Sequence, residues 1–287
     1  SDTVLKIGYR LSQIGQPEAS LAIDDQLLAL RSALSDRFPD DDHLHRLLAW
    51  AHQHRGTMLV VLQRNDEGSE AFRAAMMSSL EAMRVAKYSR PSVLDADRLI
   101  AVTCTTFESA GLIRELVEFA EAYDRQVTEL NDRSLPIDGE IIGLLGIGLY
   151  RLGRLTEADP TLERAIGLLE ARDPNDWRAW YCRSLRGSVL LDLGRRDEAT
   201  VLLTEGYRGV SDRRASINPK HIHRLQHAAD LLKRLDDPNA ASGEARGETN
   251  DDFGEEGPTE ADRPTGEPPG APKDRAPSPQ SPREERR

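Results

Sequence analysis

Residues 148–166 read GLYRLGRLTEADPTLERAI, and residues 189–207 read VLLDLGRRDEATVLLTEGY. Both stretches contain the pattern L-x-x-L-G-R-x-x-E-A. Gly153 and Gly194 are 41 residues apart, as are Ala158 and Ala199. Self-similarity at a fixed spacing of this kind is typical of repeat architectures. The pattern therefore predicts stacked structural units rather than an active site.

The composition excludes some classes of partner. Charged residues make up 30% of the 287 residues, and the formal net charge is -11. Nucleic-acid and anionic membrane surfaces attract clustered Lys and Arg, so this balance disfavours both. The longest apolar run, residues 141–149, is interrupted by glycines and is far below the roughly 20 residues that span a bilayer. We expect no membrane partner and no nucleic-acid partner.

The two cysteines, Cys104 and Cys182, are 78 residues apart and lack a C-x-x-C context. This favours reduced core thiols and a cytoplasmic protein, although a disulfide between them is the alternative. The chain begins at Ser1 without Met, a basic leader or a long apolar core. Such a start is unlike a signal peptide and suggests a piece cut from a longer protein.

The composition changes near Pro238. Residues 238–287 hold nine of the 16 prolines and six of the 21 glycines, with twelve acidic and seven basic residues. A segment of this kind buries too little apolar surface to offset its ordering entropy. We expect a repeat array over residues 1–237 and a disordered acidic tail over residues 238–287.

Helical periodicity dominates residues 1–237. Apolar residues recur at spacings of three and four in Ala71–Met83, Leu112–Leu130 and Ala158–Leu169. No convincing period-two strand pattern occurs. The predicted fold class is therefore all-α.

Extended in both directions, the opening pattern resembles the tetratricopeptide repeat, a helix pair with small residues at its eighth and twentieth positions. The resemblance implies an α-solenoid of about five pairs, near 1–40, 41–91, 92–136, 137–174 and 175–217, with a capping helix at 219–235. The small residues would let paired helices approach closely. The repeat-packing residues are Gly8, Gly56, Cys104, Gly146 and Gly187, with Ala158 and Ala199 at the twentieth position.

In the first unit, Asp24 stands where this pattern expects an apolar residue. The spacings between units, 41 to 48 residues, exceed the usual 34. The helices or linkers must therefore be longer than in a standard repeat.

Residues 173–210, followed by NPKHIHRLQHAADLLKRL, resemble the closing part of large bacterial serine/threonine protein kinases. In those proteins a tetratricopeptide array follows the catalytic domain. The matching features are the surroundings of Trp177, the helix around Gly187, Glu198-Ala199 and Glu205–Tyr207. The resemblance implies a regulatory or scaffolding C-terminal region whose kinase domain lies upstream of this chain.

The chain itself shows no catalytic or cofactor-binding motif. Asp252-Phe253-Gly254 spells a kinase metal site, yet no H-R-D loop precedes it and it falls in the predicted disordered tail. The run Gly143–Gly148 resembles a dinucleotide-binding loop, but no strand leads into it and helix packing explains Gly146. We therefore expect no enzyme activity and no cofactor for this chain.

The seven histidines form two groups, His43, His45, His52 and His54, then His221, His223 and His227. His223 and His227 are four residues apart, but no third ligand stands at a suitable spacing. Solvated helix histidines are the preferred interpretation. Asp40-Asp41-Asp42 follows Pro39 and fits the start of a helix, where acidic residues interact favourably with the helix dipole. No metal site is predicted.

A binding surface remains as the functional candidate. In the tetratricopeptide fold the first helix of each unit builds an inner wall, where partner peptides usually bind. The expected function is a protein-interaction scaffold, with a stand-alone scaffold without a kinase and an unrecognised helical enzyme as alternatives. The predicted groove residues are Tyr9, Trp50, Thr57, Arg98, Thr105, Glu140, Tyr150, Arg151 and Tyr181.

The Lys and Asn pair with which some tetratricopeptide domains hold a peptide carboxylate is absent. The first unit has Leu5 and Tyr9 at those positions, and the second has Gln53 and Thr57. Binding of a chaperone tail is therefore not expected.

Overall fold

The computed structural model describes residues 10–11, 14–130 and 138–236, and throughout these residues the regular structure is helical, without a strand. The all-α prediction is confirmed. The chain divides into Ser1–Ala245 and Arg246–Arg287, and the second unit lies outside the described residues. The α-helices are α2 (Pro17–Arg37), α3 (Asp42–Val61), α4 (Asn65–Val85), α5 (Arg90–Ser109), α6 (Ile113–Leu130), α7 (Gly139–Arg151), α8 (Leu155–Arg172), α9 (Trp177–Asp192), α10 (Arg196–Asp212) and α11 (His223–Lys233).

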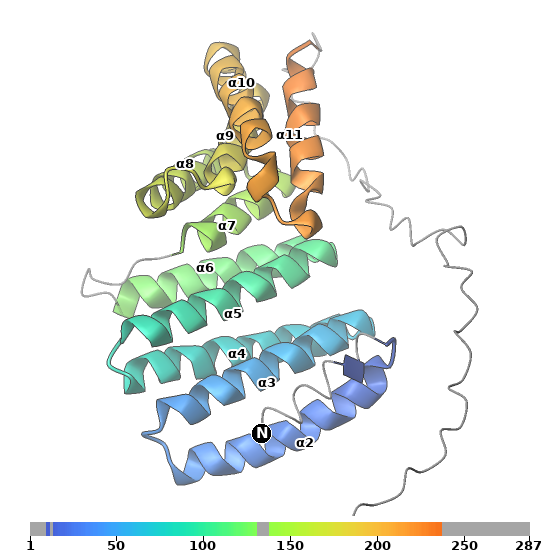
Figure 1. The fold of residues 1–287 in the computed structure, drawn as a ribbon, viewed down its shortest axis with the longest axis vertical. Helices are drawn as coiled ribbons and strands as arrows, with labels where there is room; N and C mark the ends of the chain where they lie inside the picture. The colour runs from blue at the N-terminus through green and yellow to red at the C-terminus, as the bar shows by residue number, and fades with distance from the viewer. Residues whose placement is uncertain (1–9, 12–13, 131–137, 237–287) are drawn as a thin grey trace, which may run out of the picture. The chain divides into compact units, whose positions relative to one another are not determined.

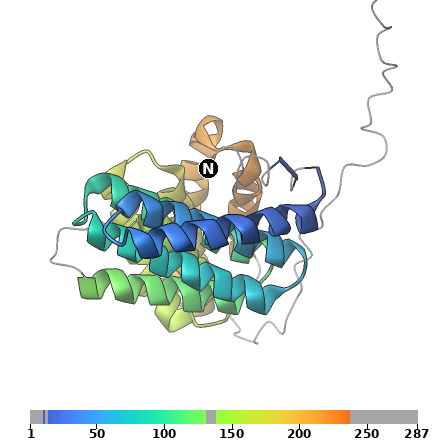
Figure 2. The same cartoon turned by 90° about the horizontal axis from the view of Figure 1, so that it is seen from below.

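The helices form hairpins that stack on one another (Figure 1). Helix α3 packs on α4, α5 on α6, α7 on α8, and α9 on α10. The first helices also meet across the stack, since α5 contacts both α3 and α7, and α7 contacts α9. Figure 2 looks along the stack from the end where α2 lies. The described chain is thus an α-solenoid of stacked helix pairs.

The L-G-R-x-x-E-A pattern builds the turn inside each hairpin. Gly153 has a φ of +72°, which favours glycine, and the N–H of Arg154 donates to the Leu149 carbonyl at 2.9 Å. Two hydrogen bonds then join the Arg154 guanidinium to the Glu157 carboxylate in the first turn of α8. The same geometry recurs at Gly194, which has a φ of +77°.

Small residues occupy equivalent contact points in three hairpins. An added Cβ would lie 2.6 to 2.8 Å from a side-chain carbon of the residue 16 positions later, which is too close for two carbon atoms. Each hairpin thus keeps its helices close where a larger side chain would separate them. The contacts join Gly56 to Phe72, Gly146 to Leu162 and Gly187 to Leu203.

The other predicted packing residues that the structure describes are buried as well. Cys104, Ala158 and Ala199 have no exposed surface. Gly143, Gly146 and Gly148 lie within α7, so the glycine-rich run is helical. Gly8 lies outside the described residues.

Asp24 departs from the apolar residue expected at its position, and the structure shows how α2 accommodates it. Its side chain is fully buried, and Oδ2 lies 2.7 Å from Nδ1 of His54 on α3. A buried carboxylate needs such a partner because desolvation of an isolated charge is costly. The Asp24–His54 contact therefore takes the place of an apolar contact between α2 and α3.

Asp40-Asp41-Asp42 marks a helix start. The Asp41 carboxylate accepts from the N–H groups of His43 and Leu44 at 3.0 and 3.2 Å, which caps the start of α3. Asp138 and Asp176 cap α7 and α9 in the same way. Among the described helices, none combines the length and apolar character needed to cross a membrane.

Candidate functional site: the inner wall of the stack

The candidate site is the surface formed by the first helices α3, α5, α7 and α9, which we call the inner wall. On this surface α3 packs on α5, and α5 packs on α7. Trp50 is half-buried there, and its indole Nε1 donates to the Asp95 carboxylate at 3.3 Å, which joins α3 to α5. Arg98 is exposed on α5. Thr57 is half-buried, and its hydroxyl donates to the Gln53 carbonyl.

The part of the inner wall on α7 and α9 holds four predicted groove residues. Glu140 on α7 pairs with Arg178 on α9, with 3.5 Å between Oε2 and Nε. The Tyr150 hydroxyl lies 2.7 Å from the Ser188 hydroxyl. These contacts fix α7 against α9. Arg151 is exposed at the end of α7.

Tyr181 differs most from its prediction as a groove residue. It is only 5% exposed, its hydroxyl lies 2.7 Å from Nδ1 of His227, and the Arg224 guanidinium lies 5.0 Å from the centre of its ring. Burial raises the pKa of the Tyr181 hydroxyl well above its ordinary value, so this hydroxyl stays neutral. Helix α11 closes Tyr181 off, and an outside partner reaches it only when α11 moves.

The interpretation of the histidines as solvated helix residues is wrong for three of them. His45 is buried between the Ser35 hydroxyl and the Pro39 carbonyl, His54 contacts Asp24, and His227 faces Tyr181. Side chains from other elements meet these rings, and the histidine spacing alone could not show that. In the described part of the chain, no cluster of three or more His, Cys, Asp or Glu side chains is arranged to hold a metal ion.

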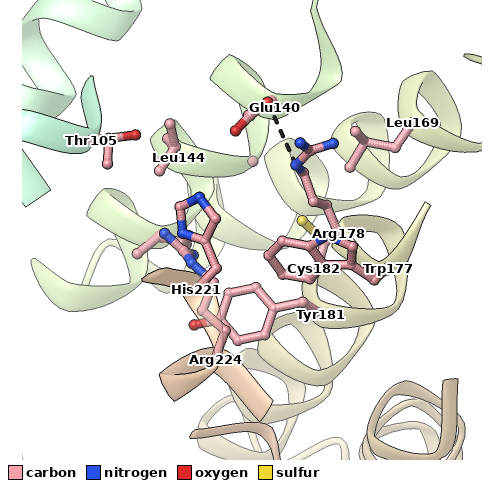
Figure 3. Close-up of a pocket in the computed structure, with 12 residues that line it drawn as sticks. Thr105, Glu140, Leu144, Leu169, Trp177, Arg178, Tyr181, Cys182, His221 and Arg224 are labelled. Atoms are coloured by element: carbon pink, nitrogen blue, oxygen red, sulfur yellow. Dashed lines mark ion pairs between the residues drawn. The ribbon is translucent and has the colours of Figure 1, made fainter. Parts of the chain in front are cut away.

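A small cavity lies between α5, α7, α9 and the start of α11 (Figure 3). Its lining includes Thr105, Glu140, Tyr181, Cys182 and Arg224. The cavity volume is about 30 Å³, which is room for a water or two. Small-molecule ligands occupy pockets of several hundred Å³, so this cavity does not suit a metabolite.

A broader hollow of about 450 Å³ lies on the side of the second helices, between α2, α3, α4 and α6. Its charged residues Glu81 and Arg84 pair with each other at 2.5 Å. Ser35 and His45 also line it, with 3.2 Å between the Ser35 hydroxyl and Nδ1 of His45, and Nε2 of His45 lies 2.8 Å from the Pro39 carbonyl oxygen. Both ring nitrogens of His45 thus have partners that hold α2 and the α2–α3 loop against α3.

The predictions for the two cysteines can also be compared with the structure. Cys104 and Cys182 are free and buried, and burial raises the pKa of the Cys182 thiol to about 12, which makes it unreactive at neutral pH. Tyr9, Asp252-Phe253-Gly254 and the predicted tail lie outside the described residues.

The contacts between α11 and the inner wall were not predicted from the sequence, because they join residues far apart in the chain.

The repeated hairpins and their inner wall define the chain as a helical repeat protein of the α-solenoid class. No protein-family model and no curated protein sequence matches it. Solved structures of a Podosopora anserina protein, described as a kinesin light chain with nearly identical TPR-like repeats, are similar to it. One of these structures is of a single-substitution variant of that protein. It is 14% identical to this chain with a TM-score of 0.47, and the match covers 75% of this chain and 95% of that chain. The other is also 14% identical, with a TM-score of 0.43, covering 76% and 97%.

Proposed function

We propose that the chain is a protein-interaction scaffold whose inner wall binds helical or extended segments of partner proteins. The observation that carries the proposal is that the inner wall already holds a helix, α11, through residues at predicted inward positions. The surface is thus shaped for a polypeptide. The small volume of the cavity and the net charge of -11 support a protein partner over a metabolite or a nucleic acid.

A finer proposal is that the chain forms the regulatory C-terminal part of a bacterial serine/threonine protein kinase in the cytoplasm. The resemblance of residues 173–210 to such proteins supports the kinase, and two free, buried thiols fit a reducing compartment. Reading the coding sequence upstream of Ser1 tests this proposal. A catalytic domain with H-R-D and D-F-G motifs is expected, and its absence would favour a stand-alone scaffold.

Site-specific crosslinking tests whether partners bind the inner wall. A photo-reactive amino acid is placed at Arg98 or Arg151 on the inner wall and, as a matched control, at Met77 or Val201. Both control residues are exposed on second helices. We expect proteins in a lysate of the source cells to be captured from the inner-wall positions only. Equal capture from all four positions would contradict the proposal.

Substitutions then measure the contribution of the wall. Replacing both Trp50 and Arg98 by Ala should weaken the captured complex by about tenfold or more, because aromatic and Arg side chains commonly anchor interfaces. Arg73→Ala, at an exposed position on α4, is the matched control and should leave the affinity unchanged. The affinity is measured by titration of the purified partner.

A further inference from the structure

Helix α11 packs on the last hairpin, and two long side chains of its segment reach first helices farther along the stack. In Figure 1 it stands upright beside α10, whereas α5 and α6 lie nearly horizontal. It packs on α9 and α10, its Arg224 reaches α5, and Arg234, the residue that follows it, reaches α7. A helix that only capped the last hairpin would need contacts with α9 and α10 alone. The longer reach shows that α11 and Arg234 together contact three successive hairpins of the stack.

The polar contacts of α11 fall on inner-wall residues. Arg224 donates to the Glu108 carboxylate on α5 at 2.5 Å, and His227 meets the Tyr181 hydroxyl on α9. Directly after α11, at the first residue of the short 3-10 helix η3 (Arg234–Asp236), the Arg234 guanidinium binds three side chains. These are the hydroxyls of Tyr150 on α7 and Ser188 on α9 and the carboxylate of Asp192 on α9.

These contacts come from one face of α11. Arg224, His227 and Arg234 are separated by three and seven residues, which places them along a single face of a helix. Ala228 and Leu231 are buried on that face at 0% and 4% exposure, while Gln226, Asp230 and Lys233 are exposed. An amphipathic helix that lays apolar anchors and basic ends into a groove is a common mode of peptide recognition.

The charges of the wall match the ends of α11. Arg224 and Arg234 are ten residues apart, which is about 15 Å along a helix. Glu108 and Asp192 meet them at the two ends. Both arginines are largely buried, so each carboxylate is held in a poorly solvated site where an unpaired charge is costly. The wall therefore selects basic groups at this separation.

We infer that this part of the inner wall is a receptor surface for an amphipathic helix of the pattern R-x-x-H-x-x-x-L-x-x-R, and that α11 is its resident occupant. The inference rests on the proposed function, because the outside occupant is a partner protein that carries such a helix. A partner binds by replacing α11. Because α11 is tethered, its effective concentration at the wall is in the millimolar range, so a partner binds weakly until α11 is released.

A peptide with the sequence of residues 217–236 tests the inference on the full chain. The chain is compared with a release variant that carries Arg224→Glu and Arg234→Glu, in which the acidic wall repels α11. We expect the labelled peptide to bind the release variant at least about tenfold more tightly than the unmodified chain, measured by fluorescence anisotropy. Equal, weak binding to both chains, with the release variant folded by circular dichroism, would overturn the inference.

A charge exchange separates recognition from a general loss of structure. In the peptide, Arg224→Glu should weaken binding to the release variant by about tenfold or more. Lys233→Glu, the same charge change on the exposed face, should leave it unchanged. Adding Glu108→Arg to the release variant should lower binding of the unmodified peptide and restore binding of the Arg224→Glu peptide. Absence of that restoration would contradict the assigned contact.

Hydrogen exchange on the unmodified chain covers the case in which the release variant does not fold. The amides of α11 should exchange at least about tenfold faster than those of α7 and α9, because α11 detaches while the hairpins stay folded. Exchange of α11 only with global unfolding would make it an integral part of the core and overturn the inference. A release variant that becomes dimeric by light scattering as it gains binding would identify a second copy, not a partner, as the occupant.

The two proposals can fail separately. If crosslinks form from Arg98 and Arg151 but the peptide does not bind the released wall, the scaffold function stands and the assignment of α11 is wrong. If the peptide binds but no inner-wall crosslink forms, the wall accepts only its own helix and the proposed function is wrong.

Discussion

Single glycines decide how closely the hairpins of this chain pack. At Gly187 an added Cβ would lie 2.8 Å from Leu203 Cγ, 2.9 Å from the Leu203 backbone nitrogen and 3.2 Å from the Ala199 carbonyl oxygen. Two of these three neighbours are backbone atoms, which cannot turn aside as the end of a side chain can. The α9–α10 hairpin would have to open to admit even one methyl group.

Gly187→Ala should therefore destabilise the chain, by about 1–3 kcal/mol in the free energy of unfolding, as overpacking of a core typically does. Gly167→Ala is the matched control. Gly167 also lies within a helix, but an added Cβ there meets nothing within 4 Å. The control should be stabilising by about 0.5–1 kcal/mol, because Ala is the better helix former. Urea denaturation measures both, and a neutral Gly187→Ala would contradict the packing role.

The sequence predicts the packing of these glycines but not the long-range polar contacts of the fold. The positions of Gly56, Gly146 and Gly187 follow from the repeat spacing, because equivalent positions in equivalent hairpins face the same contact. The Asp24–His54 and Glu108–Arg224 contacts join residues 30 and 116 positions apart. Neither pair repeats in other units, so no pattern indicates it. Unique long-range polar contacts are the part of the site that required the structure.

At the scale of elements, the same turn geometry occurs at five positions in the described chain. Its central residue has a positive φ and is followed by the second helix of the hairpin. Four of the five are glycines, and the fifth is Gln63 between α3 and α4, with a φ of 61°. A left-handed conformation costs a residue with a side chain about 1–2 kcal/mol. The five residues are Gly15, Gln63, Gly111, Gly153 and Gly194.

Gln63→Gly should relieve this cost and stabilise the chain by about 0.5–1 kcal/mol, less than the full cost because glycine is more flexible in the unfolded chain. The converse change, Gly153→Ala, places a side chain at a φ of +72° and should destabilise by a similar amount. Thermal unfolding followed by circular dichroism measures both. A lower melting temperature for Gln63→Gly would show that the turns are not equivalent.

Elements also differ in how far their sequence predicts them. The amphipathic patterns in Ala71–Met83, Leu112–Leu130 and Ala158–Leu169 predicted helices, and α4, α6 and α8 contain them with only the first residue of the second stretch outside. The amphipathic face of α11 could also be predicted. The surface that this face covers could not, because an apolar stripe indicates burial without saying against which helices. The occupied inner wall therefore became visible only in three dimensions.

At the scale of the molecule, the hairpins share one apolar core. A single cluster of buried side chains runs from Ala49 on α3 to Leu231 on α11. Neighbouring repeats that share an interface tend to unfold together. A titrating group buried in the middle of the stack should therefore influence the unfolding of every described hairpin from α3 onward.

Asp97 on α5 is such a group. It is 5% exposed, and its carboxylate accepts a hydrogen bond from the Tyr123 hydroxyl at 2.6 Å. Burial raises the pKa of Asp97 to about 7, although the hydrogen bond from Tyr123 acts in the opposite direction. In the unfolded chain the pKa of an Asp is about 4. Between these values the folded chain binds more protons than the unfolded chain.

The contribution of Asp97 to stability is therefore largest below about pH 4 and is lost as the pH rises towards 7, with a slope of at most about 1.4 kcal/mol per pH unit. Asp97→Asn removes this dependence, so the variant should gain stability relative to the unmodified chain as the pH rises from 5 to 7. Asp40→Asn, an equal charge change at an exposed position, should show no such trend. Urea unfolding at each pH, followed by circular dichroism and by tryptophan fluorescence, measures the difference. A parallel pH dependence for the chain and Asp97→Asn would contradict the raised pKa, and different slopes from the two probes would contradict unfolding as one unit.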